Sequence, residues 1–272
     1  MARHCHRLLI RCVTGCAAAI LILPVLTAQT VRQGPEESKS LVDRVSQSVT
    51  TFLGELSNVE CTEAVSQTRL KEHGKIEFSE NSTYDYLVLA ESDGGELTLA
   101  ESRLAKQEPQ KTTHLPLMVS NGFSTLLLIF HPEYRSGFEF KQLEDEEMDG
   151  KAYARLAFRH IPGMRSTAAL MVRGREYPLD LQGVVWIDKG TGEIRKISAD
   201  LESSMEDIGL RAMHTEVDYA PVTFQETANT YWLPQTATID VESLHERWRN
   251  VHHFTDYRQF STSAKEKGVG KQ

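Results

Sequence analysis

Hydrophobic residues change their spacing once along the chain, near residue 59. Between residues 38 and 57 they recur at every third or fourth position, which places them on one side of a helix. The residues of this apolar stripe are Leu41, Val45, Val49, Phe52, Leu53 and Leu56. From Val59 onward, hydrophobic and polar residues alternate, as they do in β-strands with one buried face. The pattern therefore predicts one amphipathic helix followed mainly by strands.

Turn signals divide the alternating part of the chain into short strands. Asp93-Gly94-Gly95 separates two runs of strand-forming residues, 84–90 and 97–100, and predicts a hairpin. Asp149-Gly150 is typical of a type I′ turn and predicts a second hairpin. Further runs typical of strands cover residues 168–172, 179–187, 193–201, 211–225, 230–242 and 248–261. Strands joined by short turns are antiparallel neighbours, so we expect roughly nine or ten of them in one meander.

Two stretches interrupt the strands. Residues 105–116 are polar, contain two prolines and indicate a loop. Residues 122–131 contain six large apolar residues close together, between Asn121 and Pro132. These flanks favour a short buried helix, and a buried strand stays open as the alternative.

These elements predict a mostly β (α+β) fold with two helices. Twist accumulates along such a meander and curls it into an open or closed barrel, because exposed sheet edges are a liability. The concave face of the sheet is where the helices can bury their apolar sides. We expect a single domain over residues 38–262, preceded by a polar lead-in at 29–37 and followed by a flexible tail at 263–272.

Residues 1–28 have the composition of a secretory signal peptide. Three arginines and no acidic residue accompany an apolar run over 12–26, and Ala28 offers a small residue for cleavage. A membrane anchor is one alternative, although the run is short for a span and contains Pro24. A lipoprotein signal ending at Cys16 is another, although the most apolar residues follow that cysteine. We expect export, and no stable transmembrane segment after cleavage.

The net charge of the chain argues against one class of partner, nucleic acid. The 272 residues include 30 Lys and Arg against 38 Asp and Glu, for a formal net charge of −8. An acidic chain without a basic block has no electrostatic footprint for nucleic acid.

Removal of the signal peptide leaves Cys61 as the one cysteine, so no internal disulfide can form. We expect Cys61 to be a small buried hydrophobe rather than a nucleophile.

The sequence contains no catalytic or metal-binding motif with its residues at the required spacing. No two histidines form an H-E-x-x-H pair, and the adjacent His252 and His253 would point to opposite faces of a strand. The acidic run at 144–149 lacks the spacing of an EF-hand loop. No nucleophile motif of the G-x-S-x-G or S-x-x-K type has its full context. We therefore expect that the protein is not an enzyme and needs no metal and no cofactor. A hydrolase of unknown type is the least favoured alternative for its function.

The C-terminal part of the chain resembles a known family. The motifs are GVVWID at 183–188, TGEIRKI at 191–197, VDY at 217–219, YWLP at 231–234 and FTDYRQF at 254–260. They resemble the outer-membrane lipoprotein-sorting (LolA/LolB-like) superfamily and its uncharacterised secreted bacterial relatives. The resemblance implies a strongly curved antiparallel sheet that forms an unclosed barrel, helices in its concave face, and a periplasmic location. Residues 59–103 have no counterpart in that pattern.

The resemblance also implies a function in binding acyl chains. We expect an exported, non-enzymatic protein that binds a hydrophobic ligand, a lipid or a lipoprotein acyl chain, in a half-barrel cavity. The candidate cavity residues are Val45, Val49, Phe52, Phe123, Leu127 and Phe130. Side chains that line a cavity and side chains that fill a core look alike in sequence. The rival hypothesis is therefore an envelope protein-interaction or sensor module with a fully packed core.

Overall fold

The computed structural model describes residues 35–56, 59–71, 74–93, 96–107, 124–172, 174–224 and 230–259. The predicted signal peptide, most of the polar lead-in, the C-terminal tail and Phe123 lie outside these residues.

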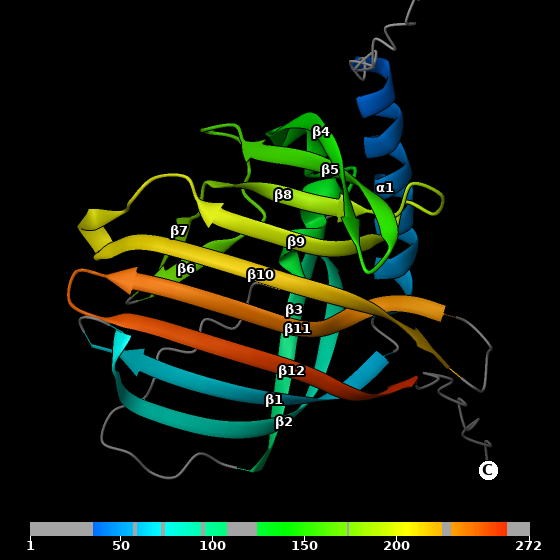
Figure 1. Cartoon of the computed structure of the whole chain (residues 1–272). Coiled ribbons are helices and arrows are strands. Elements are labelled where there is room, and N and C mark those ends of the chain that lie inside the picture. Colours follow the sequence, from blue (N-terminus) through cyan, green and yellow to red (C-terminus); the bar gives the residue numbers. More distant parts are fainter. Residues whose placement is uncertain are drawn as a thin grey trace, which may run out of the picture. The chain divides into compact units, whose positions relative to one another are not determined.

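Ten strands form one antiparallel sheet in the order β3-β2-β1-β12-β11-β10-β9-β8-β5-β4 (Figure 1). Their bounds are β1 (Val59–Leu70), β2 (Ile76–Asp93), β3 (Glu96–Gln107), β4 (Phe138–Met148), β5 (Lys151–His160), β8 (Leu181–Ile187), β9 (Ile194–Leu201), β10 (Leu210–Thr223), β11 (Thr230–Ser243) and β12 (Arg247–Gln259). The strands β3 and β4 are the two edges, so the sheet is not closed into a barrel. The predicted fold class is confirmed.

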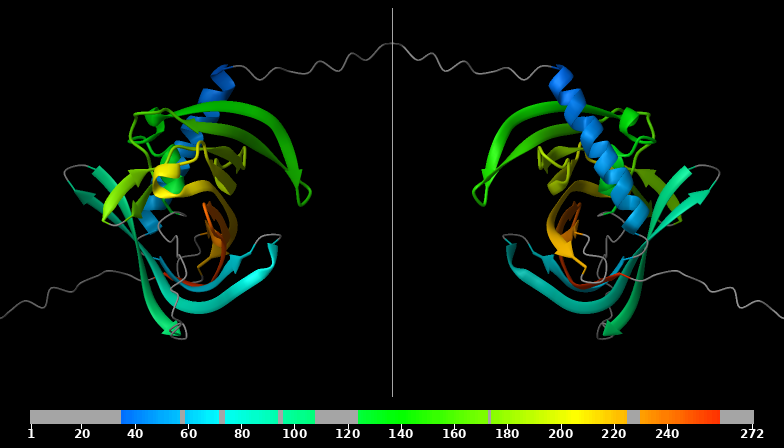
Figure 2. Two further views of the ribbon diagram at one scale, coloured as in Figure 1. Left: turned by 90° about the vertical axis from the view of Figure 1, so that its left-hand side faces the viewer. Right: turned by 90° about the vertical axis from the view of Figure 1, so that its right-hand side faces the viewer.

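The longest helix bridges the two ends of this sheet. Helix α1 (Pro35–Leu56) contacts β2 near one edge and β4 at the other. Figure 2 shows α1 crossing the open side of the curved sheet. Its apolar stripe is confirmed, because Leu41, Val45, Val49 and Leu53 are buried, whereas Phe52 is only half-buried. Among the described residues, no helix combines the length and the apolar character that crossing a membrane requires.

The apolar stretch around residue 127 forms a short 3-10 helix. This element, η2 (Thr125–Phe130), lies against α1, and five of its six residues are buried. The prediction of a buried helix over the strand alternative is therefore confirmed. Two further 3-10 turns are η3 (Arg135–Gly137) and η4 (Glu206–Ile208). Together, α1, η2 and the alternate residues of the strands that face them make up the hydrophobic core.

The strand predictions needed two corrections. The run at 168–172 does not join the large sheet: β6 (Ala169–Val172) pairs with β7 (Arg175–Pro178) in a separate two-stranded ribbon. The alternation did not predict β7, because this strand is short, mostly exposed and ends in proline. The predicted loop at 105–116 is also shortened, since β3 continues to Gln107 and residues 108–116 lie outside the described residues.

The hairpin turn between β4 and β5 has the predicted type. Asp149 has a φ of 52° and Gly150 a φ of 75°, both in the left-handed region that a type I′ turn requires. Asparagine, aspartate and glycine tolerate this region best. The dipeptide therefore sets the register in which β4 pairs with β5.

Candidate functional site

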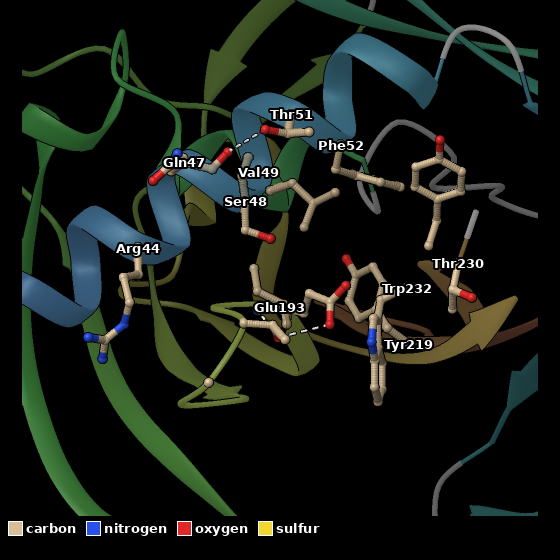
Figure 3. Close-up of a pocket in the computed structure, with 15 residues that line it drawn as sticks. Arg44, Gln47, Ser48, Val49, Thr51, Phe52, Glu193, Tyr219, Thr230 and Trp232 are labelled. Atoms are coloured by element: carbon tan, nitrogen blue, oxygen red, sulfur yellow. Dashed lines mark hydrogen bonds between the residues drawn. The ribbon is translucent and has the colours of Figure 1, made fainter. Parts of the chain in front are cut away.

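A pocket of about 510 Å³ lies between α1 and the sheet, where β9 begins, β10 ends and β11 begins (Figure 3). Its lining residues are Arg44, Gln47, Ser48, Val49, Thr51, Phe52, Leu127, Gly190, Thr191, Glu193, Ile194, Tyr219, Thr230, Tyr231 and Trp232. This volume is within the range of small-molecule binding pockets, roughly 300–1,000 Å³.

The helix contributes a polar edge next to an apolar wall. Arg44, Gln47 and Thr51 are exposed and recur at helical spacing, whereas Val49, close by on α1, is buried. The Thr51 hydroxyl donates a hydrogen bond to the Gln47 carbonyl at 3.1 Å, so it is occupied within the helix. Phe52 stands at the border between the two kinds of surface. The pocket therefore has a polar mouth along α1 and an apolar interior.

The turn between β8 and β9 holds the opposite rim of the pocket. The Asp188 carboxylate accepts hydrogen bonds from the backbone N–H of Gly190, at 2.8 Å, and of Thr191, at 3.2 Å. Gly192 adopts a φ of 78°, and a β-carbon at this position would lie 3.0 Å from the Arg44 backbone. Only glycine meets both conditions without strain. The glycine thus lets the turn pack closely against α1.

Tyr219 brings an unusual polar group to the interior of the pocket. Its side chain is 1% exposed, and Figure 3 shows it directed from β10 toward α1. Among the residues that the structure describes, its buried hydroxyl has no hydrogen-bond partner. Burial, with a smaller contribution from the negative charge of Glu101, raises the pKa of this phenol far above its ordinary value. The group is therefore a hydrogen-bond donor that lacks an acceptor.

The six residues predicted to line a cavity fall into three groups. Val49, Phe52 and Leu127 line the pocket. Val45 and Phe130 are completely buried and are not part of its lining. Phe123 lies outside the described residues. The prediction that these residues bind a ligand remains a prediction.

Sequence reasoning missed the sheet wall of the pocket. Tyr219 and Tyr231 both belong to quoted motifs, VDY and YWLP, which we interpreted as markers of strands. The alternation of β10, in which Met213, Thr215 and Val217 are buried, could have placed Tyr219 on the inner face. It could not have shown that a pocket lies beside it.

A second polar feature is a cluster of buried ionisable side chains on β1, β3 and β12. Arg103 binds both carboxylate oxygens of Glu63, from Nε at 2.6 Å and from Nη2 at 2.9 Å. A further nitrogen of the same guanidinium, Nη1, lies 2.9 Å from Glu101. His252 Nδ1 lies 2.8 Å from Glu63, and both of these side chains are completely buried. We call these four residues the charged cluster.

The cluster has two carboxylates with opposite pKa shifts. Burial alone would raise the pKa of Glu63, but hydrogen bonds from His252 and Arg103 outweigh burial and hold this pKa below its ordinary value. For Glu101 burial prevails over the attraction of Arg103, and the pKa is raised. Burial also lowers the pKa of His252, despite the neighbouring Glu63. A neutral His252 therefore donates from Nδ1 to an ionised Glu63.

A small cavity of about 20 Å³ separates the pocket from the cluster. It shares Phe52 and Leu127 with the pocket, and it is also lined by Cys61, Tyr86 and Ser124. Tyr86 connects the cavity to the cluster, since the Arg103 guanidinium lies 4.8 Å from the centre of its ring. Burial raises the pKa of Cys61 to about 12, so the thiol stays protonated. The expected burial of Cys61 is confirmed.

Histidines and carboxylates do not gather into a metal site in the part of the chain that the structure describes. No group of three or more His, Cys, Asp or Glu side chains there is arranged to hold a metal ion. The predicted orientation of the histidine pair is confirmed, because His252 is buried and His253 is exposed.

Comparisons with known proteins found similar structures and no similar sequences. No protein-family model and no curated protein matches the chain. A domain assigned to outer membrane lipoprotein sorting, from Vibrio parahaemolyticus, matches at 13% identity and a TM-score of 0.39 over 84% of this chain and 95% of that domain. A LolA superfamily protein from Nitrosomonas europaea matches at 12% identity and a TM-score of 0.36, over 82% of this chain and 94% of that protein. A DUF1329 family protein from Desulfovibrio piger matches at 14% identity and a TM-score of 0.37, over 86% of this chain and 95% of that protein.

The first two of these proteins carry descriptions that correspond to the superfamily that the sequence motifs resemble.

Proposed function

We propose that the chain is an exported, non-enzymatic carrier that binds a hydrophobic ligand, a lipid or a lipoprotein acyl chain, between α1 and strands β9 to β11. The observation that carries this proposal is the pocket of about 510 Å³ between the helix and the sheet. Its interior is formed by buried residues such as Val49, Leu127 and Ile194. Its mouth carries exposed polar residues such as Arg44 and Thr191.

This distribution of polarity matches an amphiphile. Burial of an acyl chain contributes about 0.8 kcal/mol per methylene group, and the polar mouth leaves a head group in contact with water. Only part of the burial energy appears as affinity, because association itself costs several kcal/mol. A chain that is only partly inserted would therefore bind with moderate affinity, as a carrier that must release its cargo requires.

The proposal includes no catalytic step. The pair His252 and Glu63, in which both side chains are completely buried, lies on β12 and β1 and is not part of the pocket lining. We place the binding in the periplasm on the basis of the predicted signal peptide at residues 1–28 and of the resemblance to the lipoprotein-sorting superfamily.

Titration with phenylnaphthylamine, an uncharged probe that fluoresces in apolar sites, tests the proposal. We expect saturable binding to the wild-type protein and weaker binding to Phe52→Ala, which removes part of the apolar wall. Ser48→Phe should fill the pocket from a half-buried position and abolish binding while the protein stays folded.

Phe78→Ala is the matched control, because Phe78 is also partly buried against the core but does not line the pocket. It should bind the probe as the wild type does. If the folded wild-type protein does not bind the probe, or if all three variants bind it equally, the proposal is wrong. Failure to bind would favour the interaction or sensor module.

A further inference from the structure

We propose that the Tyr219 hydroxyl is the specificity-determining group of the pocket and selects ligands with an uncharged carbonyl, an acyl ester or amide, over free fatty acids. This inference rests on the proposed function, because it concerns which hydrophobic ligand the same pocket takes.

The first step of the argument is the unpaired hydroxyl. Buried polar groups in folded proteins nearly always have a hydrogen-bond partner, so an exception needs an explanation. Tyr219 is 1% exposed and lines the pocket, and no group in the described part of the chain forms a hydrogen bond with its hydroxyl. Phenylalanine would fill the same space without leaving a buried donor unpaired. A ligand that places an acceptor at this depth would supply the missing partner.

The second step is the chemistry of that partner. Burial keeps the Tyr219 phenol protonated, so the group offers an O–H donor to the ligand. A carbonyl oxygen accepts this bond without bringing a donor of its own that would need another buried acceptor. An alkyl chain without a carbonyl leaves the hydroxyl unpaired. The geometry therefore favours an acyl compound over a plain hydrocarbon.

The third step is the charge around the hydroxyl. Glu101 acts on Tyr219 with a negative charge, and its own side chain is 1% exposed. The nearby guanidinium of Arg103 is already paired with Glu63 and Glu101. Arg44 is exposed at the mouth of the pocket, away from the buried interior. A carboxylate at the depth of Tyr219 would lose its hydration, and neither of these described cations, Arg103 and Arg44, would be available there to compensate its charge.

Displacement of phenylnaphthylamine by methyl laurate and by laurate, at neutral pH, tests the inference. The two ligands have the same acyl chain and differ in charge. We expect the wild-type protein to prefer methyl laurate. Tyr219→Phe should weaken methyl laurate binding about three- to tenfold, the worth of one neutral hydrogen bond, and leave laurate binding unchanged.

Two measurements separate specificity from a structural role. The melting temperature of unliganded Tyr219→Phe should equal or exceed that of the wild type, because the variant removes an unpaired buried group. The control Tyr84→Phe removes a hydroxyl from a half-buried tyrosine that does not line the pocket, and it should keep the preference for the ester.

The possible failures point to different conclusions. If the wild-type protein binds neither phenylnaphthylamine nor either laurate ligand, the proposed function fails. If both ligands bind and Tyr219→Phe leaves their affinity ratio unchanged, the carrier proposal stands and the role of Tyr219 is wrong. A wild-type preference for laurate would overturn the inference directly.

Discussion

The inner face of the sheet has two halves that obey the same alternation but bury different chemistry. One cross-strand row runs through both halves, with Val65, His252, Ala237, Val217, Ile197, Val185 and Leu156 as successive neighbours. On β8, β9 and β10, the row contains only aliphatic residues. On β12, it contains His252, which is as fully buried as they are. We call β3, β2, β1 and β12 the polar half, and β10, β9, β8 and β5 the apolar half.

The comparison shows that an inward position does not by itself require an apolar residue. The apolar half is stabilised mainly by burial of hydrocarbon, which is additive and non-directional, and His160 at the end of β5 is paired with Asp180. The polar half has to satisfy each charge with a specific partner, because an unpaired buried charge is very costly. The two halves should therefore respond differently to mutation and to pH.

Loss of Arg103 should be the most damaging single change in the polar half. Arg103→Met keeps a long apolar stem but leaves Glu63 and Glu101 buried without their cation. We expect the free energy of unfolding to fall by about 3–5 kcal/mol, the cost of removing one partner of a buried ion pair. Urea unfolding monitored by circular dichroism measures the change.

Arg258→Met is the control for this variant. Arg258 pairs with Glu60 and Asp85, but its side chain is 53% exposed, and exposed pairs contribute little. Equal effects of the two substitutions would show that the charged cluster does not hold the polar half together.

The apolar half should lose stability through a cavity rather than through an unpaired charge. Leu156 is completely buried at the centre of β5. Leu156→Ala should lower the free energy of unfolding by roughly 2–5 kcal/mol, and the loss should not depend on pH. Leu104→Ala, at a position that is 71% exposed, should change it by less than about 0.5 kcal/mol. A pH-dependent loss for Leu156→Ala would contradict the division into halves.

Cys61 tests the part of the polar half that lines the small cavity. Its thiol is buried and protonated, so a thiol reagent should label it slowly in the native protein and rapidly after unfolding. Cys61→Ser should cost about 1–3 kcal/mol, because it buries a more polar hydroxyl, and Cys61→Ala should cost less. Rapid labelling of native protein would show instead that solvent reaches the cavity.

The smallest effect at neutral pH is expected for Glu101→Gln. The raised pKa of Glu101 means that its stabilising contribution is present below its unfolded pKa of about 4.5 and is lost as the pH rises through the folded value. Glutamine keeps the size of the side chain and removes a charge that burial disfavours, so we expect a change of at most about 1 kcal/mol at pH 7. The stability of this variant should rise more steeply with pH than that of the wild type.

Glu63→Gln is the matched variant with the opposite sign. The lowered pKa of Glu63 stabilises the fold above pH 4.5, and this contribution disappears as the pH falls through the folded value. The variant should therefore be less stable than the wild type at neutral pH and approach it in acid. Parallel pH profiles for the two variants would show that the carboxylates of the cluster are equivalent.

Local patterns predicted a large part of the fold. The spacing of Leu41, Val45, Val49 and Leu53 predicted α1, and Asp149-Gly150 predicted a type I′ turn. The alternation predicted the burial of Cys61 and the opposite directions of His252 and His253. It did not separate β6 and β7 from the large sheet, because a short exposed ribbon has no apolar face for a pattern to show.

The candidate sites were less predictable than the fold. Phe52 and Val45 belong to the same stripe of α1, yet Phe52 lines the pocket and Val45 is packed in the core. Their difference depends on which strand lies opposite each residue, and the helix sequence does not contain that information. The charged cluster was missed entirely, because the pattern showed only that His252 and His253 point to opposite faces and not which of them is buried.

The sequence by itself determined the features that depend on neighbours along the chain: the helix, the turns, the inward and outward faces of the strands, and the surplus of acidic residues. Tertiary structure alone decided which inward residues meet. Glu63 and His252 are 189 positions apart in the sequence, and Glu63 and Arg103 are 40 positions apart. The pocket likewise joins α1 to strands that begin after residue 190. Periodicity reports the direction of a side chain, whereas charge pairing and cavity shape depend on the curvature and register of the whole sheet.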